Sequence, residues 1–297
     1  ELFPIHLRAR FSALWCHDLA MGRSEEKVKG TAWNYDKIFV LSEFMRKQYQ
    51  QVYSFPDELV FLTRNGVDLD TVAKVRAALP ADVTRNPLSL VYSARPERGL
   101  DVLLEHVMPR VLKYEPNAKL FLSTYHNPVD QLQDFYGKCD VLANQLRAQF
   151  GPAAVQNLGP LNKAQLYQMY HAAGVYVYPT PSAFAPEFDE ISCISAMEAM
   201  ACGLPVVTSN RGALPETLAP GAGVLISDAV HTPQYYDAFA SSVLGFMRSP
   251  ERLQAASQAG LQRAERLDWK GVAEQWSELF ERHIREKNNS LATLANH

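Results

Sequence analysis

The chain has 297 residues, of which 47% are hydrophobic and 21% are charged, and its 29 basic and 32 acidic side chains give a formal net charge of −3. These proportions are those of an ordinary globular protein, and they exclude disorder, a collagen-like repeat or a coiled coil as a description of the whole chain. Without a basic excess, the composition gives no support to a nucleic-acid-binding surface. At roughly 100–200 residues per domain, the length predicts two domains or one large one.

Cysteine spacing and the length of the apolar runs indicate the kind of cellular compartment in which the protein is found. The four cysteines (Cys16, Cys139, Cys193 and Cys202) form no C-x-x-C pair, so the sequence predicts neither a zinc site nor a thioredoxin-like site. Buried, reduced thiols are the expectation, and they fit a reducing compartment. No apolar run approaches the roughly 18 residues of a membrane span, and the first residues lack the pattern of a signal peptide. We therefore expect a soluble, cytoplasmic protein.

Short apolar runs alternate with longer amphipathic stretches along most of the chain. The runs, which predict strands, are 12–16, 37–41, 59–63, 88–93, 119–123, 155–159, 175–179, 205–209 and 223–227. The stretches, which predict helices, are 42–53, 100–114, 128–150, 163–173, 194–202, 233–249, 252–267 and 268–287. The runs lack strict alternation, as strands buried on both faces do. This order predicts an α/β fold with parallel sheets that helices cover on both faces.

A change in composition divides these elements into two domains. The segment ALPADVTRNP (78–87) has two prolines, several turn formers and no apolar periodicity, so it predicts an interdomain linker. Three predicted strands precede this segment and six follow it. We therefore place a first domain at 1–84 and a second at 85–267, with a helix at 268–290 that crosses back to the first.

Polar residues follow two predicted strands of the first domain. His17 and Asp18 come directly after the run SALWC, and they project from the edge of the first sheet. A lone histidine is more often structural than catalytic. Asn65 and Gly66 follow the third run, where this dipeptide is a strong turn signal that needs no further role.

Two arginines follow the first predicted strand of the second domain. Arg95 and Arg98 lie in a short loop, and Gly99 leads from that loop into a predicted helix. Two guanidinium groups beside a helix N-terminus suit the binding of a pyrophosphate. Taken alone, this segment fits a solvated loop equally well.

The segment PEFDEISCISAMEAMACGLPVVTSNRGALPE (186–216) passes from an acidic loop into a helix and then into a strand. Ser192 is the predicted N-cap, which leaves Glu190 in the loop and Glu198 inside the helix. The free amides of residues 192–194 then point at one crevice, as at a helix N-terminus that binds an anion at the carboxyl edge of a parallel sheet. The alternative is that both glutamates are ordinary helix-start and surface residues.

Together these motifs resemble a retaining glycosyltransferase of the two-domain GT-B type, and they are most similar to glycosyltransferase family 4. The resemblance covers roughly residues 12–280. Its most specific part is the E-x7-E pair that runs into EAMACGLPVVTSN, and DKIFVLSEFMRKQY followed by RNGVD is also typical of the family. The resemblance implies two Rossmann-like domains with parallel sheets. It also implies that the amino-terminal domain is incomplete, because the units that normally precede SALWCHD are absent.

The resemblance implies a role for each candidate residue. The implied catalytic set is His17, Arg95, Arg98 and Glu190, with the two arginines on the donor diphosphate and Glu190 on the transferred sugar. Glu198 would hold the ribose hydroxyls. The other implied donor contacts are Gly159, Pro160 and Leu161 against the nucleobase and Ile191, Ser192, Cys193 and Ile194 around the diphosphate. Asp18 and Asn65 are candidates for the acceptor side.

The reaction implied by the resemblance moves a sugar from a UDP- or GDP-linked donor to a sugar, a lipid or another acceptor. Family chemistry implies retained configuration and no requirement for a metal ion or another cofactor. A non-catalytic nucleotide-sugar-binding or scaffold protein and a nucleotide-sugar epimerase are the alternatives. The expected partners include no nucleic acid, and contact with a membrane surface stays open for the case of a lipid acceptor.

Overall fold

The computed structural model describes residues 9–20, 22, 25–125 and 129–295, with side chains as far as residue 289. The segment before Ala9 and the predicted helix start at Pro128 lie outside these residues. The chain divides into two compact units: the first is Glu1–Gly66 with Leu267–His297, and the second is Val67–Arg266. None of the helices in the described part of the chain is long and apolar enough to cross a bilayer.

In the first unit, three short parallel strands form a sheet in the order β1–β2–β3. They are β1 (Ala13–Trp15), β2 (Lys37–Val40) and β3 (Val60–Leu62), and each lies within a predicted run. The connections contain α1 (Glu25–Ala32) and α2 (Glu43–Tyr53). We did not predict α1, because only two of its residues are apolar enough to be buried and they do not form a periodic pattern.

The last helix of the chain, α12 (Trp269–Ala295), also belongs to the first unit. Trp276 packs edge-on against Phe39 and Trp15, with ring centroids 5.2 and 5.0 Å apart. Its indole Nε1 donates a hydrogen bond of 2.6 Å to the hydroxyl of Thr63. The predicted apolar face of this helix is thus in contact with the three-stranded sheet.

The second unit contains six parallel strands in the order β6–β5–β4–β7–β8–β9. They are β4 (Asn86–Tyr92), β5 (Lys119–Leu122), β6 (Val155–Asn157), β7 (Ala173–Tyr178), β8 (Val206–Ser209) and β9 (Gly223–Ile226), and each coincides with a predicted run. The chain winds outward from β4 to one edge, returns to β7 beside β4, and winds outward to the other edge. Folds with this order bind ligands at the carboxyl ends of the two central strands, where the winding reverses.

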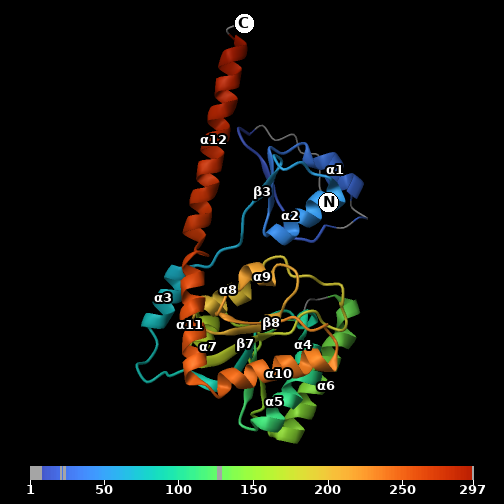
Figure 1. Cartoon of the computed structure of the whole chain (residues 1–297), viewed down its shortest axis with the longest axis vertical. Helices are drawn as coiled ribbons and strands as arrows, with labels where there is room; N and C mark the ends of the chain where they lie inside the picture. Colours follow the sequence, from blue (N-terminus) through green and yellow to red (C-terminus); the bar gives the residue numbers. More distant parts are fainter. Residues whose placement is uncertain (1–8, 21, 23–24, 126–128, 296–297) are drawn as a thin grey trace. The chain divides into compact units, whose positions relative to one another are not determined.

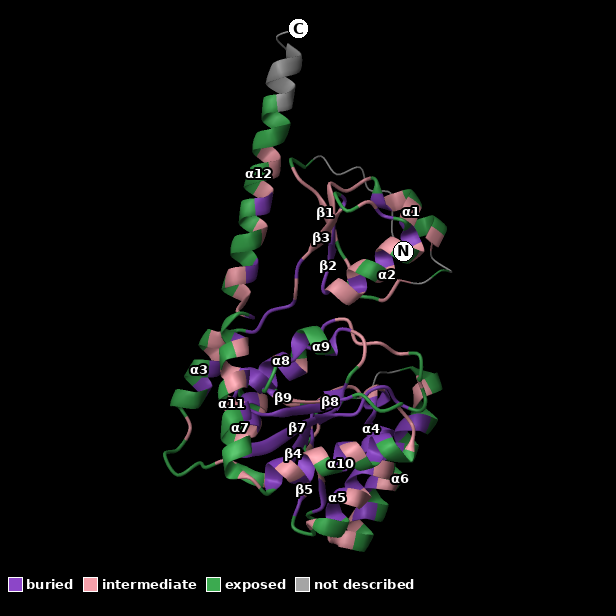
Figure 2. Ribbon diagram, in the orientation of Figure 1, coloured by how far each residue is buried: buried purple, intermediate pink, exposed green. Residues whose placement is uncertain are grey.

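Helices cover both faces of this sheet, as predicted (Figure 1). One face carries α4 (Leu100–Val102), which continues through Leu103–Val107 into α5 (Met108–Tyr114), together with α6 (Gln133–Phe150) and α10 (Pro233–Met247). The other face carries α7 (Lys163–Ala172), α8 (Ile194–Ala201) and α11 (Pro250–Glu265). Because both faces are covered, β7 and β8 are buried along their whole length (Figure 2). Two short helices, α3 (Leu69–Ala77) and α9 (Leu214–Thr217), were not predicted.

The segment predicted as an interdomain linker lies inside the second unit. The helix α3 packs on α7, so the second unit begins at Val67, before the segment 78–87. Within that segment, Arg85 donates hydrogen bonds to the carbonyl oxygens of Ala173 (2.6 Å) and Cys202 (2.9 Å). These bonds fasten the proline-containing segment to the ends of α7 and α8, which is why it does not separate the two units.

Candidate active site

The candidate residues of the second unit follow the carboxyl ends of its strands. The loop with Arg95 and Arg98 follows β4, and the loop with Glu190 follows β7. These two strands are neighbours at the point where the winding of the sheet reverses. The turn at 159–161 follows β6. Because parallel strands end at the same edge of a sheet, the fold brings these segments to one side of the unit.

The loops after β4 and β7 contact one another. The guanidinium carbon of Arg98 lies 3.4 Å from the centroid of the Phe188 ring, which restrains the arginine by a cation–π contact. Gly99 has a φ of +107°, and a Cβ atom there would lie 2.4 Å from the carbonyl oxygen of Pro179. Only glycine permits this backbone geometry and this close approach. Gly99 therefore determines how closely the two loops meet.

Arg95 is positioned by a buried carboxylate. Its Nε lies 3.4 Å from Oε1 of Glu97, whose other oxygen accepts a hydrogen bond of 3.3 Å from the hydroxyl of Tyr136. The backbone carbonyl of Arg95 accepts a bond of 2.7 Å from the hydroxyl of Tyr92. Within the described chain, the two terminal nitrogens of Arg95 donate no hydrogen bond. They can therefore present hydrogen-bond donors to an anion.

Glu190 is held by its own loop and by β7. Its Oε1 accepts hydrogen bonds from the amides of Ile191 (3.0 Å) and Ser192 (3.1 Å), and its Oε2 accepts one of 2.9 Å from the hydroxyl of Tyr178. Burial raises the pKa of Tyr178 well above its usual value, and the charge of Glu190 raises it further, so this tyrosine stays a neutral donor. Three donors fill most of the roughly four acceptor positions of a carboxylate, which leaves about one for a ligand.

The prediction that Ser192 is the N-cap of α8 is wrong. The helix begins at Ile194 with Cys193 as its N-cap residue, and no side chain caps it. The Ser192 amide donates to Glu190, because the carboxylate folds back onto the residues that follow it. Among the residues that the structure describes, the amides of Cys193 and Ile194 have no intramolecular acceptor, so the helix start still offers two donors.

The backbone of Glu190 packs on the turn after β8. The amide of Ala213 donates a hydrogen bond of 2.7 Å to the carbonyl oxygen of Glu190. A Cβ atom at Gly212, where φ is +58°, would lie 2.4 Å from that oxygen. Arg211 and Asp189 add an ion pair of 2.6 Å between the same two segments. The turn therefore positions the carboxylate loop, and its glycine, three residues after the end of β8, was the only sign of this role in the sequence.

Glu198 is buried within α8, where 4% of the residue is exposed. Its Oε1 accepts hydrogen bonds from Nζ of Lys163 (2.5 Å) and from the hydroxyl of Tyr167 (2.8 Å), both on α7. Burial and the charge of Glu198 raise the pKa of Tyr167, which keeps its proton. No residue of the described ranges donates to Oε2, which leaves that atom for a ligand hydroxyl. Lys163 and Tyr167 were not predicted as partners of Glu198, although their spacing of four places them on one helix face.

The turn at 159–161 is fixed to the ends of β5 and β6. Gly159 has a φ of +66°, its amide donates a hydrogen bond of 3.0 Å to Oδ1 of Asn157, and its carbonyl accepts one of 3.1 Å from the hydroxyl of Ser123. Pro160 is exposed and Leu161 is half-buried. The turn thus presents an exposed surface at the carboxyl edge of the sheet.

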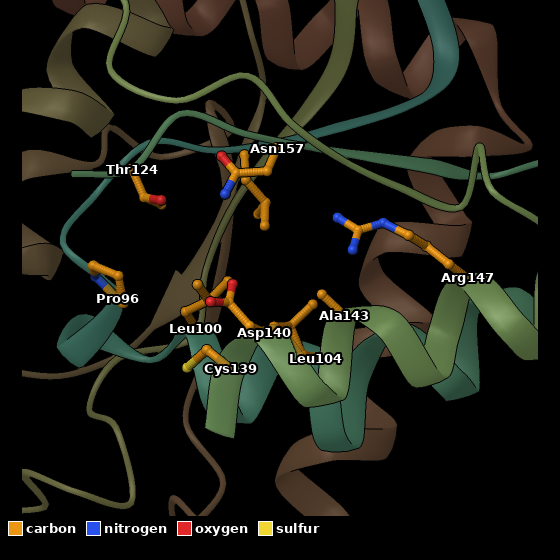
Figure 3. A pocket seen from close by; sticks show the side chains of 10 residues that line it. Pro96, Leu100, Leu104, Thr124, Cys139, Asp140, Ala143, Arg147 and Asn157 are labelled. Carbon is orange, nitrogen blue, oxygen red and sulfur yellow. The ribbon is translucent and has the colours of Figure 1, made fainter. Parts of the chain in front are cut away.

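A small cavity lies between α6, the start of α4 and the ends of β5 and β6 (Figure 3). The side chains of Asp140 and Arg147 on α6 point into it from one side, and Asn157 points into it from the end of β6. Its volume of about 20 Å³ holds about one water molecule. This cavity, with both polar and apolar walls, is therefore too small for a nucleobase.

The remaining candidates lie in the first unit. His17 and Asp18 follow β1 and are exposed, and the ring centroid of His17 lies 4.4 Å from that of Trp15. The hydroxyl of Tyr49 donates a hydrogen bond of 3.0 Å to the carbonyl of Asp18. Asn65 follows β3 and is buried. The fold thus brings these three residues to the carboxyl edge of the first sheet, as it brings the arginines and glutamates to that of the second.

The cysteines are free thiols. Burial raises the pKa of Cys16 to about 11 and that of both Cys139 and Cys202 to about 12, and it raises the pKa of Cys193 further. All four are therefore protonated at neutral pH, and none is a nucleophile of the site. Apart from the gaps in the described ranges, no three His, Cys, Asp or Glu side chains form a group that could hold a metal ion.

Residues 73–263 match the protein family described as glycosyl transferases group 1. The D-inositol 3-phosphate glycosyltransferase of Segniliparus rotundus is 28% identical over 245 residues, which are 80% of this chain and 50% of that protein. The chain spans about half to three-fifths of the length of the curated relatives that it matches, with 50%, 62% and 61% for three of them.

Solved structures share the fold. Sucrose-phosphate synthase from Thermosynechococcus elongatus matches with a TM-score of 0.68 and 24% identity, over 91% of this chain and 67% of that one. Anabaena HepE, in complex with UDP and glucose, matches with a TM-score of 0.67 and 18% identity, over 91% of this chain and 71% of that one. The likeness shows the fold class predicted from the sequence, the α/β GT-B fold with parallel sheets.

Proposed function

The chain belongs to the glycosyl transferases group 1 family, and on that premise we propose that it transfers a sugar from a nucleoside-diphosphate sugar to an acceptor hydroxyl with retained configuration. The donor carries UDP or GDP, and the acceptor is a sugar, a lipid or another hydroxyl compound. One observation carries the proposal: two arginines and a glutamate follow neighbouring strands where the winding of the six-stranded sheet reverses. In this fold class, that position is the usual ligand site.

Neutralisation of the leaving group is the first task of the proposed site. A departing nucleoside diphosphate gains negative charge, which Arg95, Arg98 and the start of α8 can stabilise electrostatically. The contacts of Arg95 with Glu97 and of Arg98 with Phe188 hold both guanidinium groups in place before the reaction. Preorganised charge of this kind supports the proposal that transfer needs no metal ion.

We propose a front-face substitution. The bond from the anomeric carbon to the phosphate oxygen breaks, the acceptor oxygen bonds to the same face of that carbon, and the acceptor proton passes to the departing phosphate oxygen. Glu190 has an acceptor position left for the sugar hydroxyls, and Glu198 has its Oε2 left for the ribose. His17, which follows β1, is proposed as a further catalytic residue.

The two units have different proposed roles. The second unit binds the donor, with the exposed turn at 159–161 against the nucleobase and residues 191–194 around the diphosphate. The first unit binds the acceptor, with Asp18 and Asn65 as candidate contacts. One relative is named for inositol 3-phosphate and one structural neighbour holds UDP and glucose. UDP-glucose and phosphorylated cyclitols or sugars are therefore the first substrates to test.

Calorimetry with UDP and with GDP, followed by mass detection of a glycosylated acceptor, tests the proposal. We expect one nucleotide to bind and its sugar conjugate to add one sugar residue to an acceptor. Nucleotide binding without transfer would favour a non-catalytic binding protein, a reading supported by the use of Glu190 to hold its own loop. Conversion of the donor sugar without an acceptor would favour an epimerase. If neither UDP nor GDP bound, the proposal would be contradicted.

A further inference from the structure

A second cavity lies at the opposite edge of the six-stranded sheet, where the strands begin. Its volume is about 330 Å³, and its walls come from α3, the segment 78–87, the last turn of α7, the turn after α8, and α11. All of these belong to the second unit. The side chains that give it polar groups are Arg76, Arg85, His171 and Ser257.

The charge of this cavity is positive. None of its eleven lining residues is acidic. Arg85 is fixed by three hydrogen bonds, to the carbonyl oxygens of Tyr170, Ala173 and Cys202, and about two of its five N–H donors are left for a ligand. Within the described residues, neither Arg76 nor Arg85 has an ion-pair partner. The cavity therefore holds two guanidinium charges that the protein itself does not neutralise with a carboxylate.

His171 adds a buried donor or acceptor to the same wall. Its Nε2 is buried and has no hydrogen-bond partner among the described residues. Buried polar atoms are nearly always paired in proteins, so an unpaired nitrogen in a cavity wall suits a ligand that forms a hydrogen bond with it. Burial and the charges of Arg85 and Arg76 lower the pKa of His171, and hydrogen bonds with the backbone of Val72 and Cys202 oppose this shift in part, so the ring is neutral at pH 7 and carries a single N–H.

Space beside these groups is kept open by a glycine. Gly203 has a φ of +69°, and a Cβ atom there would lie 2.7 Å from Oγ of Ser257. Leu79, Val83 and Leu261 form an apolar part of the wall. A ligand of this cavity thus meets guanidinium and hydroxyl donors on one side and aliphatic side chains on the other.

We propose that this cavity binds the phosphate group of a small phosphorylated metabolite. Phosphate is the anion that guanidinium groups bind with paired hydrogen bonds, and the hydroxyl of Ser257 and Nε2 of His171 supply further hydrogen-bonding groups. The aliphatic wall accommodates the carbon skeleton of a phosphate monoester. The site is separate from the proposed donor site, because the two lie at opposite edges of the sheet.

Calorimetry on the full chain in phosphate-free buffer tests the proposal, with phenyl phosphate and inorganic phosphate as probes. The background is the Arg95→Ala/Arg98→Ala double variant, which removes the arginines of the proposed donor site. One-site binding should persist in that background, and a further Arg76→Gln change should weaken it about tenfold or more through loss of a charged hydrogen bond. Lys74→Gln removes the same charge from the same helix outside the cavity, and it should change the affinity by less than about twofold.

A second variant separates the cavity from its charge. Ser257→Leu narrows the cavity beside Gly203 and removes one hydroxyl donor without a change in charge, so it should abolish binding, with the melting temperature as the check on folding. Loss of binding in the double-variant background, equal losses for Arg76→Gln and Lys74→Gln, or unchanged affinity in Ser257→Leu would overturn the proposal. Phenyl phosphate should bind more tightly than inorganic phosphate, and equal affinities would overturn the assignment of a carbon-bearing ligand. A negative result with phenyl phosphate and inorganic phosphate would not change the expected UDP and GDP titrations, which test the proposed transferase function separately.

Discussion

The two compact units build a parallel sheet in different ways. The second unit is one continuous stretch, Val67–Arg266, and helices on both faces bury its central strands (Figure 2). The first unit has three short strands, and it combines residues from both ends of the chain through the contacts of α12. This difference predicts that loop substitutions in the second unit change activity without unfolding it. In the first unit, single contacts with α12 should determine stability.

Arg95→Ala should have the largest effect. Loss of one preorganised charge at a leaving group costs on the order of 10²–10³ in rate, so we expect transfer to fall at least 100-fold on the scale of that estimate. The melting temperature should hardly change, because Arg95 is about one-third exposed and its pair with Glu97 is long. Arg110→Ala, in an exposed pair with Asp237, is the matched control and should keep its transfer rate. Near-wild-type transfer by Arg95→Ala would reject the site.

Glu190→Ala should also abolish turnover and leave the core of the second unit folded. It removes a possible sugar contact and also the acceptor for the amides of Ile191 and Ser192. Glu190→Gln keeps an oxygen for those amides but removes the charge and the acceptor of the Tyr178 hydroxyl, so it separates the loop contact from the role of the carboxylate. Both variants should lose transfer, and only Glu190→Ala should speed amide exchange in the loop. A Glu190→Gln variant with normal turnover would show that the carboxylate has a structural role only.

Trp276→Ala tests the first unit. It removes ring packing against Trp15 and Phe39 and the hydrogen bond to Thr63, and aromatic truncations of this kind cost about 3 kcal/mol of unfolding free energy. Hydrogen exchange should accelerate in β1, β2 and β3 and stay unchanged in the second unit. Trp33→Ala is the control, because Trp33 is 68% exposed and its loss should cost under about 0.5 kcal/mol. Equal acceleration in both units would contradict their separation.

Gly99→Ala should have a smaller effect on the second unit. The new Cβ atom meets the Pro179 carbonyl, and the left-handed backbone adds strain, for a cost of about 2 kcal/mol. Gly137→Ala in α6 is a control with an expected effect of opposite sign. Nothing lies within 4 Å of its added Cβ atom, and the higher helix propensity of alanine should stabilise the second unit by about 0.5–1 kcal/mol. Chemical denaturation measures both. A neutral Gly99→Ala would show that the loops after β4 and β7 can move apart freely.

The strands of both units could be predicted because each is a short apolar run between polar segments. The helix α3 was missed since Val72 and Val75 are its only buried residues, and that error led to the misplaced linker. Composition could not reveal that Arg85 fastens the segment 78–87 to two helix ends, because such a bond joins residues far apart in the sequence.

The candidate site was predictable to a similar extent. Motif spacing identified Arg95, Arg98, Glu190 and Glu198 as the residues that follow the strands or lie in the helix at one sheet edge. It did not identify the partners that hold them, such as Tyr178 for Glu190, because side-chain pairing across strands and loops leaves no periodic pattern. The misassigned N-cap has the same origin, since a carboxylate that folds back on its own loop competes with the cap for the Ser192 amide.

Asp36→Asn should have the smallest effect, again in the first unit. Burial alone raises the pKa of Asp36, but hydrogen bonds from the amide and hydroxyl of Ser12 and the charges of Lys287 and His283 lower it below its ordinary value of 3.8. Because the folded-state pKa is the lower one, this carboxylate contributes stability above about pH 3.8, and the contribution is lost as the pH falls through the folded-state value. At neutral pH, Asp36→Asn should cost about 1 kcal/mol.

The pH dependence separates this charge effect from a packing effect. Urea unfolding of the wild type and of Asp36→Asn is monitored by hydrogen exchange in β1–β3. The difference in unfolding free energy between the two proteins should shrink toward zero in acid. Glu58→Gln, an exposed change of the same kind in the first unit, should show no difference at either pH. A difference that persisted in acid would mean that shape, and not charge, makes Asp36 stabilising. The contacts of Asp36 with Ser12 and α12 would then stabilise the first unit through shape and not through charge.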